Sequence, residues 1–203
     1  MAKVKDRAKP SIPPVAPGTY SAICVGSIDM GEQLVKYKDK SNYSNQVAFI
    51  FELVGEYIEV DGKQEPRTLS RKFTFSKSEK SGLRKFVESW QGKKFSNEEF
   101  GEFDTNDMVG KEAMIGVVLN DTGEYANIDT IMGLPKGMSA GKPQSELIRF
   151  DIDPWDQAAF DALPEFAQSW VMNSTNYQKQ HAPETTVAVT PPASAAAQEE
   201  CPI

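Results

Sequence analysis

The sequence is poor in the side chains that most catalytic and metal sites need. It has one histidine and two cysteines in 203 residues. His181 lies at the edge of a low-complexity segment, which excludes a histidine-dependent triad or a metal site with several histidine ligands. Cys24 and Cys201 form no Cys-x-x-Cys pattern and imply no disulfide framework, so a reducing cytoplasm is the expected location.

Long apolar runs and nucleotide-binding motifs are lacking as well. No stretch approaches about 18 apolar residues, and the N-terminus has no apolar leader, so we expect neither a membrane span nor a signal peptide. Residues 137–142 (GMSAGK) resemble a phosphate loop, but only three residues separate the glycines and Pro143 follows the lysine. We therefore expect no nucleotide site and no cofactor.

The acidic residues supply no clear catalytic set. Asp104 with Asp107 and Asp151 with Asp153 form close pairs, and both pairs lie beside expected helix starts, where carboxylates complement the helix dipole. We therefore interpret the protein as a non-enzyme without a bound metal. A metal-dependent nuclease, which would gather such acids in one site, is the least favoured alternative.

Charge is abundant and unevenly distributed. The chain carries a net charge of −7, but residues 1–94 hold 17 Lys/Arg against 11 Asp/Glu, and residues 95–203 hold 5 against 18. A basic, aromatic-containing body favours an anionic ligand such as nucleic acid. The acidic second half favours self-masking or a basic protein partner. The alternative is that both halves are ordinary solvated surface.

Composition divides the chain into four parts. Residues 1–17 form a basic, Pro-rich flexible arm that either lies along a phosphate backbone or serves as an unstructured leader. Residues 18–135 form the main domain. Residues 136–177 contain a linker and a helical appendage, in which Asp153-Pro154 is typical of a helix start. Residues 178–203 are Ala/Pro/Thr/Gln-rich, cannot bury a core and form a disordered tail with an acidic tip.

The main domain alternates between strand and helix patterns in a particular order. Strands are predicted over residues 19–28, 46–58, 67–75, 111–119 and 124–132, with a bulge at Gly26, a polar loop over 29–45 and a hairpin turn at Asp61-Gly62. Ser76 with Glu79 predicts a capping box before a helix ending near Gly92. Ser96 with Glu99 predicts a second, short helix. The apolar stripe of the first helix is Leu83, Phe86, Val87 and Trp90.

This order predicts a mainly β domain, a five-stranded OB-fold barrel with a helix between strands 3 and 4, followed by the helical appendage. An OB-fold binds ligands on the face of strands 2 and 3, between the 1–2 and 4–5 loops. Cations there neutralise phosphates, and exposed rings stack on unpaired bases. The predicted DNA-binding residues in these places are Lys36, Tyr37, Lys38, Lys40, Tyr43, Arg67, Arg71, Lys72, Phe73, Lys77 and Tyr125.

Several of these assignments have a structural alternative. Tyr37 and Tyr43 are equally compatible with stacking or with an ordinary polar loop. Arg71 shares strand parity with apolar neighbours, so it either lies in a groove or marks a bulge. The other aromatic residues of this region are assigned to the core, namely Phe49, Phe51, Phe75, Phe86 and Trp90.

Five ordered segments resemble a family of phage and prophage proteins taken to be OB-fold single-stranded-DNA-binding proteins. The segments are APGTYSAICVGSIDMG, QVAFIFEL, RTLSRKFTFSKSEKSGLRKFVESWQGKKF, DMVGKEAMIGVV and GEYANIDTIMGLPKG, within residues 14–137. The resemblance implies sequence-tolerant coating of single-stranded DNA during phage DNA replication or recombination in the bacterial host cytoplasm. It implies no catalytic residue.

The end of the chain is similar to the tail of bacterial single-stranded-DNA-binding proteins, a disordered linker ending in acidic residues, Pro and an apolar residue. Glu199, Glu200, Pro202 and Ile203 match that order, which implies docking to replication or recombination proteins. The main alternative function is a non-enzymatic protein-interaction module that binds a replication, recombination or host-defence protein. The apolar stripe within residues 155–171 is expected to pack either on the domain or on a second subunit, and the second possibility suggests a homo-oligomer.

Overall fold

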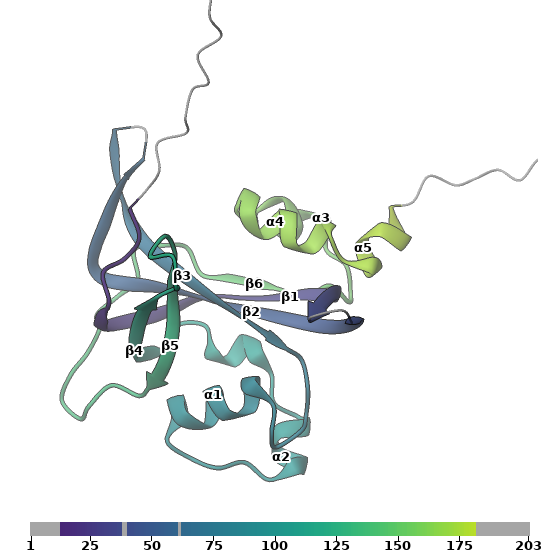
Figure 1. Ribbon diagram of the computed structural model, residues 1–203, viewed down its shortest axis with the longest axis horizontal. Coiled ribbons are helices and arrows are strands. Elements are labelled where there is room, and N and C mark those ends of the chain that lie inside the picture. Colours follow the sequence, from purple (N-terminus) through teal and green to yellow (C-terminus); the bar gives the residue numbers. More distant parts are fainter. Residues whose placement is uncertain (1–12, 38–39, 61, 182–203) are drawn as a thin grey trace, which may run out of the picture.

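The computed structural model describes residues 13–37, 40–60 and 62–181, and it is mainly β (Figure 1). One sheet contains all six strands. They are β1 (Gly18–Tyr37), β2 (Lys40–Val60), β3 (Lys63–Thr74), β4 (Glu112–Leu119), β5 (Ala126–Met132) and β6 (Ile148–Phe150). The helices are α1 (Gly82–Gln91), α2 (Asn97–Gly101), the 3-10 helix η1 (Thr105–Met108), α3 (Gln157–Asp161), α4 (Glu165–Met172) and α5 (Thr175–Gln180). None of these helices has the length and apolar character needed to cross a membrane.

The sheet is an open one. Its order is β3-β2-β1-β4-β5 with antiparallel neighbours, and β6 pairs in parallel with β1 at Gly26–Ile28. The first part of β1 pairs with β4 and a later part with β6, while β2 follows β1 along most of its length. Among the described residues β3 and β5 are not paired, so the predicted closed barrel is not formed by strand pairing. The mainly β class and the helix between the third and fourth strands agree with the prediction.

The segment predicted as a polar loop over residues 29–45 is mostly a projecting hairpin. β1 continues to Tyr37 and β2 begins at Lys40, with Gly31↔Gln46 and Tyr37↔Lys40 at the two ends of the paired segment. The loop prediction was wrong because the hairpin lies beyond the main core, so its residues are polar and lack apolar alternation. The predicted bulge at Gly26 is confirmed by a register shift between Cys24 and Gly26, and a second shift precedes Gly31.

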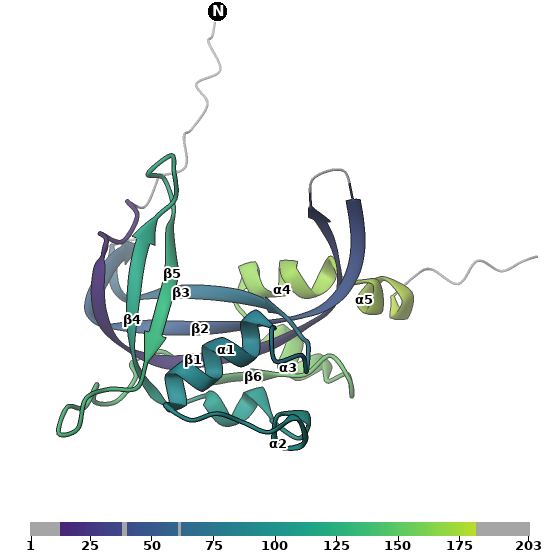
Figure 2. The ribbon, with the colours of Figure 1, turned by 60° about the horizontal axis from the view of Figure 1, so that its bottom comes forward.

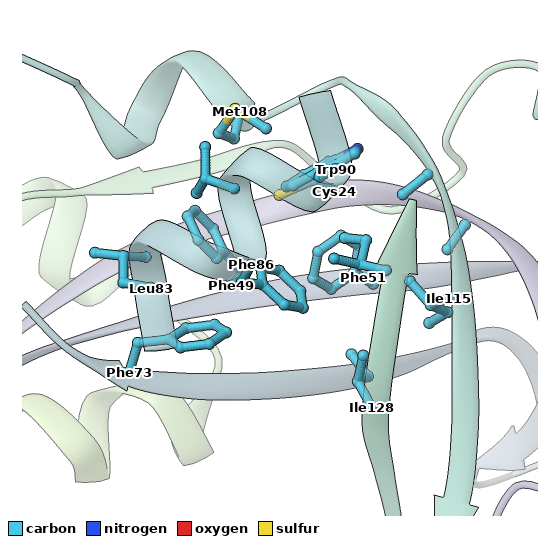
Figure 3. Close-up of a cluster of buried hydrophobic side chains, with 14 of the residues drawn as sticks. Cys24, Phe49, Phe51, Phe73, Leu83, Phe86, Trp90, Met108, Ile115 and Ile128 are labelled. Carbon is cyan, nitrogen blue, oxygen red and sulfur yellow. The ribbon is translucent and has the colours of Figure 1, made fainter. Parts of the chain in front are cut away.

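The inner face of the sheet packs against α1. The predicted stripe is confirmed, since Leu83, Phe86, Val87 and Trp90 are all buried in the same core. Figure 3 shows Leu83, Phe86 and Trp90 on the side of the helix that faces Phe49 and Phe51 of β2. The Phe49 and Phe86 rings stack with centroids 6.3 Å apart. We call this cluster the inner core. Val15 belongs to it as well, so the chain just before β1 already packs on the domain.

The caps of the two predicted helices have different outcomes. The side chain that caps α1 is Ser81, which accepts a hydrogen bond from the Arg84 N–H at 3.2 Å, so the capping box predicted at Ser76 was wrong. The Lys77–Lys80 segment remains irregular because the helix begins only where its apolar stripe meets the core. The Ser96–Glu99 capping box is confirmed at α2, and Gly92 ends α1 in the left-handed region at φ 66°.

The outer face of the sheet packs against the helices from the end of the chain. Ile23, Val25 and Ile28 of β1 and Ala48 and Ile50 of β2 are buried there. The helical partners are Phe160, Leu163, Ala167 and Val171, and we call the whole cluster the outer core. This cluster explains why the sequence of β2 is apolar on both faces. Because the stripe packs on its own chain, it no longer motivates a dimer through residues 155–171.

Candidate nucleic-acid interface

Two hairpins frame the candidate site. Figure 2 shows the β1–β2 and β4–β5 hairpins projecting to the same side of the molecule, with β3 between them. Each carries an exposed tyrosine, since Tyr43 on β2 is 59% exposed and Tyr125 just before β5 is 67% exposed. Lys36, on β1 of the first hairpin, is also exposed. Aromatic side chains free of a core are the ones available for stacking on bases.

The turn that presents Tyr125 is rigidly hydrogen-bonded. The Tyr125 N–H donates to the Asn120 side-chain oxygen at 3.0 Å, and the Asn120 N–H donates to the Tyr125 carbonyl at 2.9 Å. Gly123 adopts φ 74°, which only glycine tolerates easily. The tyrosine is therefore held at the hairpin tip by its backbone while its ring remains in solvent.

A polar cleft lies where the two unpaired strand edges approach each other. It has a volume of about 500 Å³ and is lined from β3 by Ser70, Arg71 and Lys72, and from the β4–β5 pair by Val118, Asn127, Ile128 and Asp129. We call it the seam cleft. Strand edges that have no neighbouring strand leave backbone groups free to pair with polar ligands or water.

Arg71 spans the seam cleft. Its Nη1 donates to the carbonyl oxygens of Ile128 and Asp129, both at 2.7 Å, and its guanidinium carbon lies 5.2 Å from the ring centroids of Phe73 and Phe86. Partial burial lowers the pKa of Arg71 and nearby Asp129 opposes that shift, but an arginine remains charged. Arg71 pairs in regular register with Phe49, so it lines a groove and does not mark a bulge.

Lys72 points to the outer side of β3 and meets α4. Its Nζ lies 4.0 Å from the Trp170 ring centroid, a cation–π distance, and burial lowers the pKa of Lys72. Trp170 packs edge-to-face on Phe166, with centroids 5.0 Å apart. The outer surface beside the seam cleft therefore combines a cation with two aromatic rings.

Sequence reasoning missed Trp170 and Phe166 because both were assigned to the apolar stripe of the appendage. The stripe that is buried runs through Leu163, Ala167 and Val171 at spacings of four. Phe166 and Trp170 form the neighbouring row of the helix, and Phe166 is exposed. The spacing of four residues within each row, applied to the sequence, would have separated Phe166 and Trp170 from the buried row and placed these rings nearer the surface.

Other predicted site residues lie elsewhere. Phe73 is only 6% exposed and packs against Phe86 with centroids 4.7 Å apart, so its assignment to DNA contact was wrong. Phe75 was assigned to the core but is 47% exposed, because β3 ends one residue earlier. Arg67 donates to the Pro13 carbonyl, and Lys77 lines a separate small cleft with Phe75 and Phe100.

Some predicted residues are outside what the structure describes. Lys38 lies outside the described residues, and Tyr37 and Lys40 belong to strands whose side chains at these two positions are not described. The predicted partner-binding residues of the tail, Glu199, Glu200, Pro202 and Ile203, also lie outside the described residues.

Of the groups with potential for catalysis, the Cys24 thiol is buried, and Asp104 and Asp151, one from each aspartate pair, are occupied by hydrogen bonds. Cys24 is buried, and desolvation raises the pKa of its thiol to about 12, so it stays protonated. Asp104 accepts a hydrogen bond from the Asn106 N–H at 2.8 Å at the start of η1, and Asp151 accepts from the Asn106 side chain. Within residues 13–37, 40–60 and 62–181, no three His, Cys, Asp or Glu side chains are grouped to hold a metal ion.

Comparisons of the chain with protein-family models and with curated proteins gave no match. The resemblance to phage single-stranded-DNA-binding proteins therefore stays a prediction, and the site must be judged by its geometry.

Proposed function

We propose that this protein binds single-stranded DNA, without catalysing a reaction, in the space framed by its two projecting hairpins. One observation carries the proposal: exposed Tyr43 and Tyr125 stand on the two hairpins, β3 with Arg71 and Lys72 lies between these hairpins (Figure 2), and Trp170 contacts Lys72. Rings at both ends would stack on unpaired bases, and the cations would neutralise the connecting phosphates. None of these contacts distinguishes one base from another, so binding would be sequence-tolerant.

The proposed function includes an OB-type fold in which the two end strands, β3 and β5, are not paired with each other. The sheet order β3-β2-β1-β4-β5 leaves β3 and β5 as its ends, and pairing of these two strands would close a five-stranded barrel. Arg71 already joins the two edges through the carbonyls of Ile128 and Asp129. The insertion of α1 between β3 and β4 is also that of an OB-fold.

The biological setting is proposed from the sequence resemblance. It is the coating of single-stranded DNA during phage replication or recombination, in the cytoplasm of a bacterial host, with the acidic tail tip recruiting a replication or recombination protein. The second candidate is a protein-interaction module. It is favoured by the net charge of −7 and by Asp121 and Glu124 beside Tyr125, which would repel phosphate.

The test is fluorescence anisotropy with a labelled oligo-dT of about 30 nucleotides and a duplex of equal length, each at two salt concentrations. We expect salt-sensitive binding of the single strand in preference to the duplex. Tyr43→Ala and Tyr125→Ala should each raise Kd roughly 5- to 150-fold, since stacking contributes about 1–3 kcal/mol per base. Tyr57→Ala is the matched control, because Tyr57 is an exposed tyrosine at the other end of β2.

Absence of single-strand binding at low salt would overturn the proposal and favour the interaction module. Equal losses from all three tyrosine variants would leave DNA binding in place but refute the framed site.

A further inference from the structure

Another cleft lies beside α1. It has a volume of about 340 Å³ and is lined by Lys85, Glu88, Ser89, Gly92, Lys93 and Lys94. We call it the α1 cleft. Three of its six lining residues are lysines, although the chain as a whole is acidic. The proposed stacking site makes no use of it.

The α1 cleft and the seam cleft border the same strand. Ser89 Oγ donates to the Ile131 carbonyl of β5 at 2.6 Å, just as Arg71 donates to the Ile128 and Asp129 carbonyls. Asp129 and Ile131 are two residues apart, which is about 7 Å along a strand. Figure 2 shows α1 extending from near the end of β3 toward the end of β5. The two clefts therefore follow one another along the edge of β5.

The acidic residue of the α1 cleft does not cancel its lysines. Glu88 binds Arg84 at 3.0 Å and Lys94 at 2.6 Å. Its hydrogen bonds, first of all that from Lys94, lower the pKa of Glu88 to about 2, so these pairs persist at neutral pH. Among the described residues the ion pairs of this cleft involve neither Lys85 nor Lys93, and both side chains are exposed.

Helix stability alone does not account for this arrangement. Lysines just after a helix end complement the negative end of the helix dipole, which explains Lys93 and Lys94. Lys85 lies nearly two turns before the end of α1, beyond the reach of that effect. Lys85 and Lys93 line the same cleft, so both ammonium groups are available to one ligand bound there.

We propose that the α1 cleft is an extension of the DNA path, in which Lys85 and Lys93 contact backbone phosphates of a strand leaving the seam cleft along β5. The inference rests on the proposed function, because it needs a single strand in the seam cleft. The ligand group is the phosphodiester itself, so these contacts add affinity and salt dependence without adding base preference.

The experiment compares salt slopes. Kd for dT30 is measured between 50 and 200 mM salt for the wild type, for the Lys85→Gln/Lys93→Gln double variant and for the Lys136→Gln/Lys142→Gln control. The control lysines are exposed and line neither the seam cleft nor the α1 cleft. Replacing them changes the net charge by the same amount as the double variant does. Lys94 is left intact because it pairs with Glu88.

Loss of two phosphate contacts should lower the slope of log Kd against log salt by about 1.4, since each contact on a single strand contributes about 0.7. The affinity deficit of the double variant should then shrink about 7-fold between 50 and 200 mM salt. The control should keep the wild-type slope, and circular dichroism should show both variants folded.

The outcomes separate the two proposals. Failure of the wild type to bind dT30 would overturn the proposed function and this inference with it. Normal wild-type binding, with equal slopes for the double variant and the control, would overturn the α1 path alone.

Discussion

The two faces of the sheet are covered in different ways. The inner core is covered by α1, which the chain inserts between β3 and β4. It contains a group of contacting aromatic rings from β2, β3 and α1 among aliphatic residues. The outer core is covered by α3, α4 and α5, which come from the end of the chain. The inner face therefore packs against a helix from within the strand succession, whereas the outer face packs against helices that follow the last strand.

The difference matters for the candidate site, because the site uses both faces. Arg71 lies between strand edges above the inner core, where Phe73 and Phe86 support it. Lys72, the next residue, lies on Trp170 of α4, on the outer face. The terminal helices therefore complete the surface beside β3, in addition to covering apolar residues of β1 and β2.

The largest expected effect is in the inner core. Phe49 is fully buried and packs against Phe51, Phe73, Phe86 and Trp90. Phe49→Ala should lower the free energy of unfolding by about 3–5 kcal/mol, through lost burial and the cavity left behind. Urea unfolding followed by circular dichroism measures this. A loss below about 1 kcal/mol would mean that the inner core does not carry the domain's stability.

A smaller effect is expected where the segment that leads to β6 and the terminal helices is held on the sheet. The buried Glu52 carboxylate on β2 accepts hydrogen bonds from the Gln144 N–H at 3.0 Å and the Ser145 N–H at 2.6 Å. Glu52→Ala leaves these donors unpaired and should lower the free energy of unfolding by about 1–3 kcal/mol.

Hydrogen exchange shows which face of the sheet is destabilised by Glu52→Ala. In Glu52→Ala, residues 144–181 should exchange faster while α1 keeps its protection. Equal acceleration in α1 would show instead that the two faces unfold as one unit.

The smallest effect is a pH dependence at the edge of the inner core. The pKa of Glu88 is lowered in the folded state from 4.5 to about 2, chiefly by Lys94 and also by Arg84 and the Phe95 N–H. A lowered carboxylate pKa stabilises the fold above the unfolded pKa, so this contribution is complete above about pH 5 and lost as the pH falls toward 2. Glu88→Gln should flatten the acid limb of an unfolding-midpoint curve. An unchanged acid limb would show that these ion pairs contribute nothing to stability.

The sequence predicted the parts of the fold that apolar periodicity encodes. The α1 stripe and the succession of β1 to β5 and α1 along the chain follow from apolar periodicity. The bulge was predicted from Gly26 inside a strand pattern. The projecting hairpin was missed, since its pairing is supported by distant groups. One such group is the Asn176 side chain, which accepts a hydrogen bond from the Glu32 N–H at 2.8 Å.

The site was only partly predictable for the same reason. Tyr43, Tyr125, Arg71 and Lys72 were predicted from residue type and from their place in the expected loops and strands, and their contact with DNA stays a prediction. Trp170 is separated from Lys72 by nearly a hundred residues, and only the packing of the outer core brings them together. Phe73 was misassigned because a residue's place on β3 does not reveal that the partner face is filled by α1.

The most direct test of the combined site is tryptophan fluorescence during titration with oligo-dT. The protein has three tryptophans, of which Trp90 is buried in the inner core and Trp155 packs among Phe150 and Phe160. Trp170 alone contacts Lys72. The account predicts that oligo-dT quenches the wild type and Trp155→Phe to a similar extent, and that Trp170→Phe loses most of the quenching. Full quenching in Trp170→Phe would contradict a DNA site that spans β3 and α4.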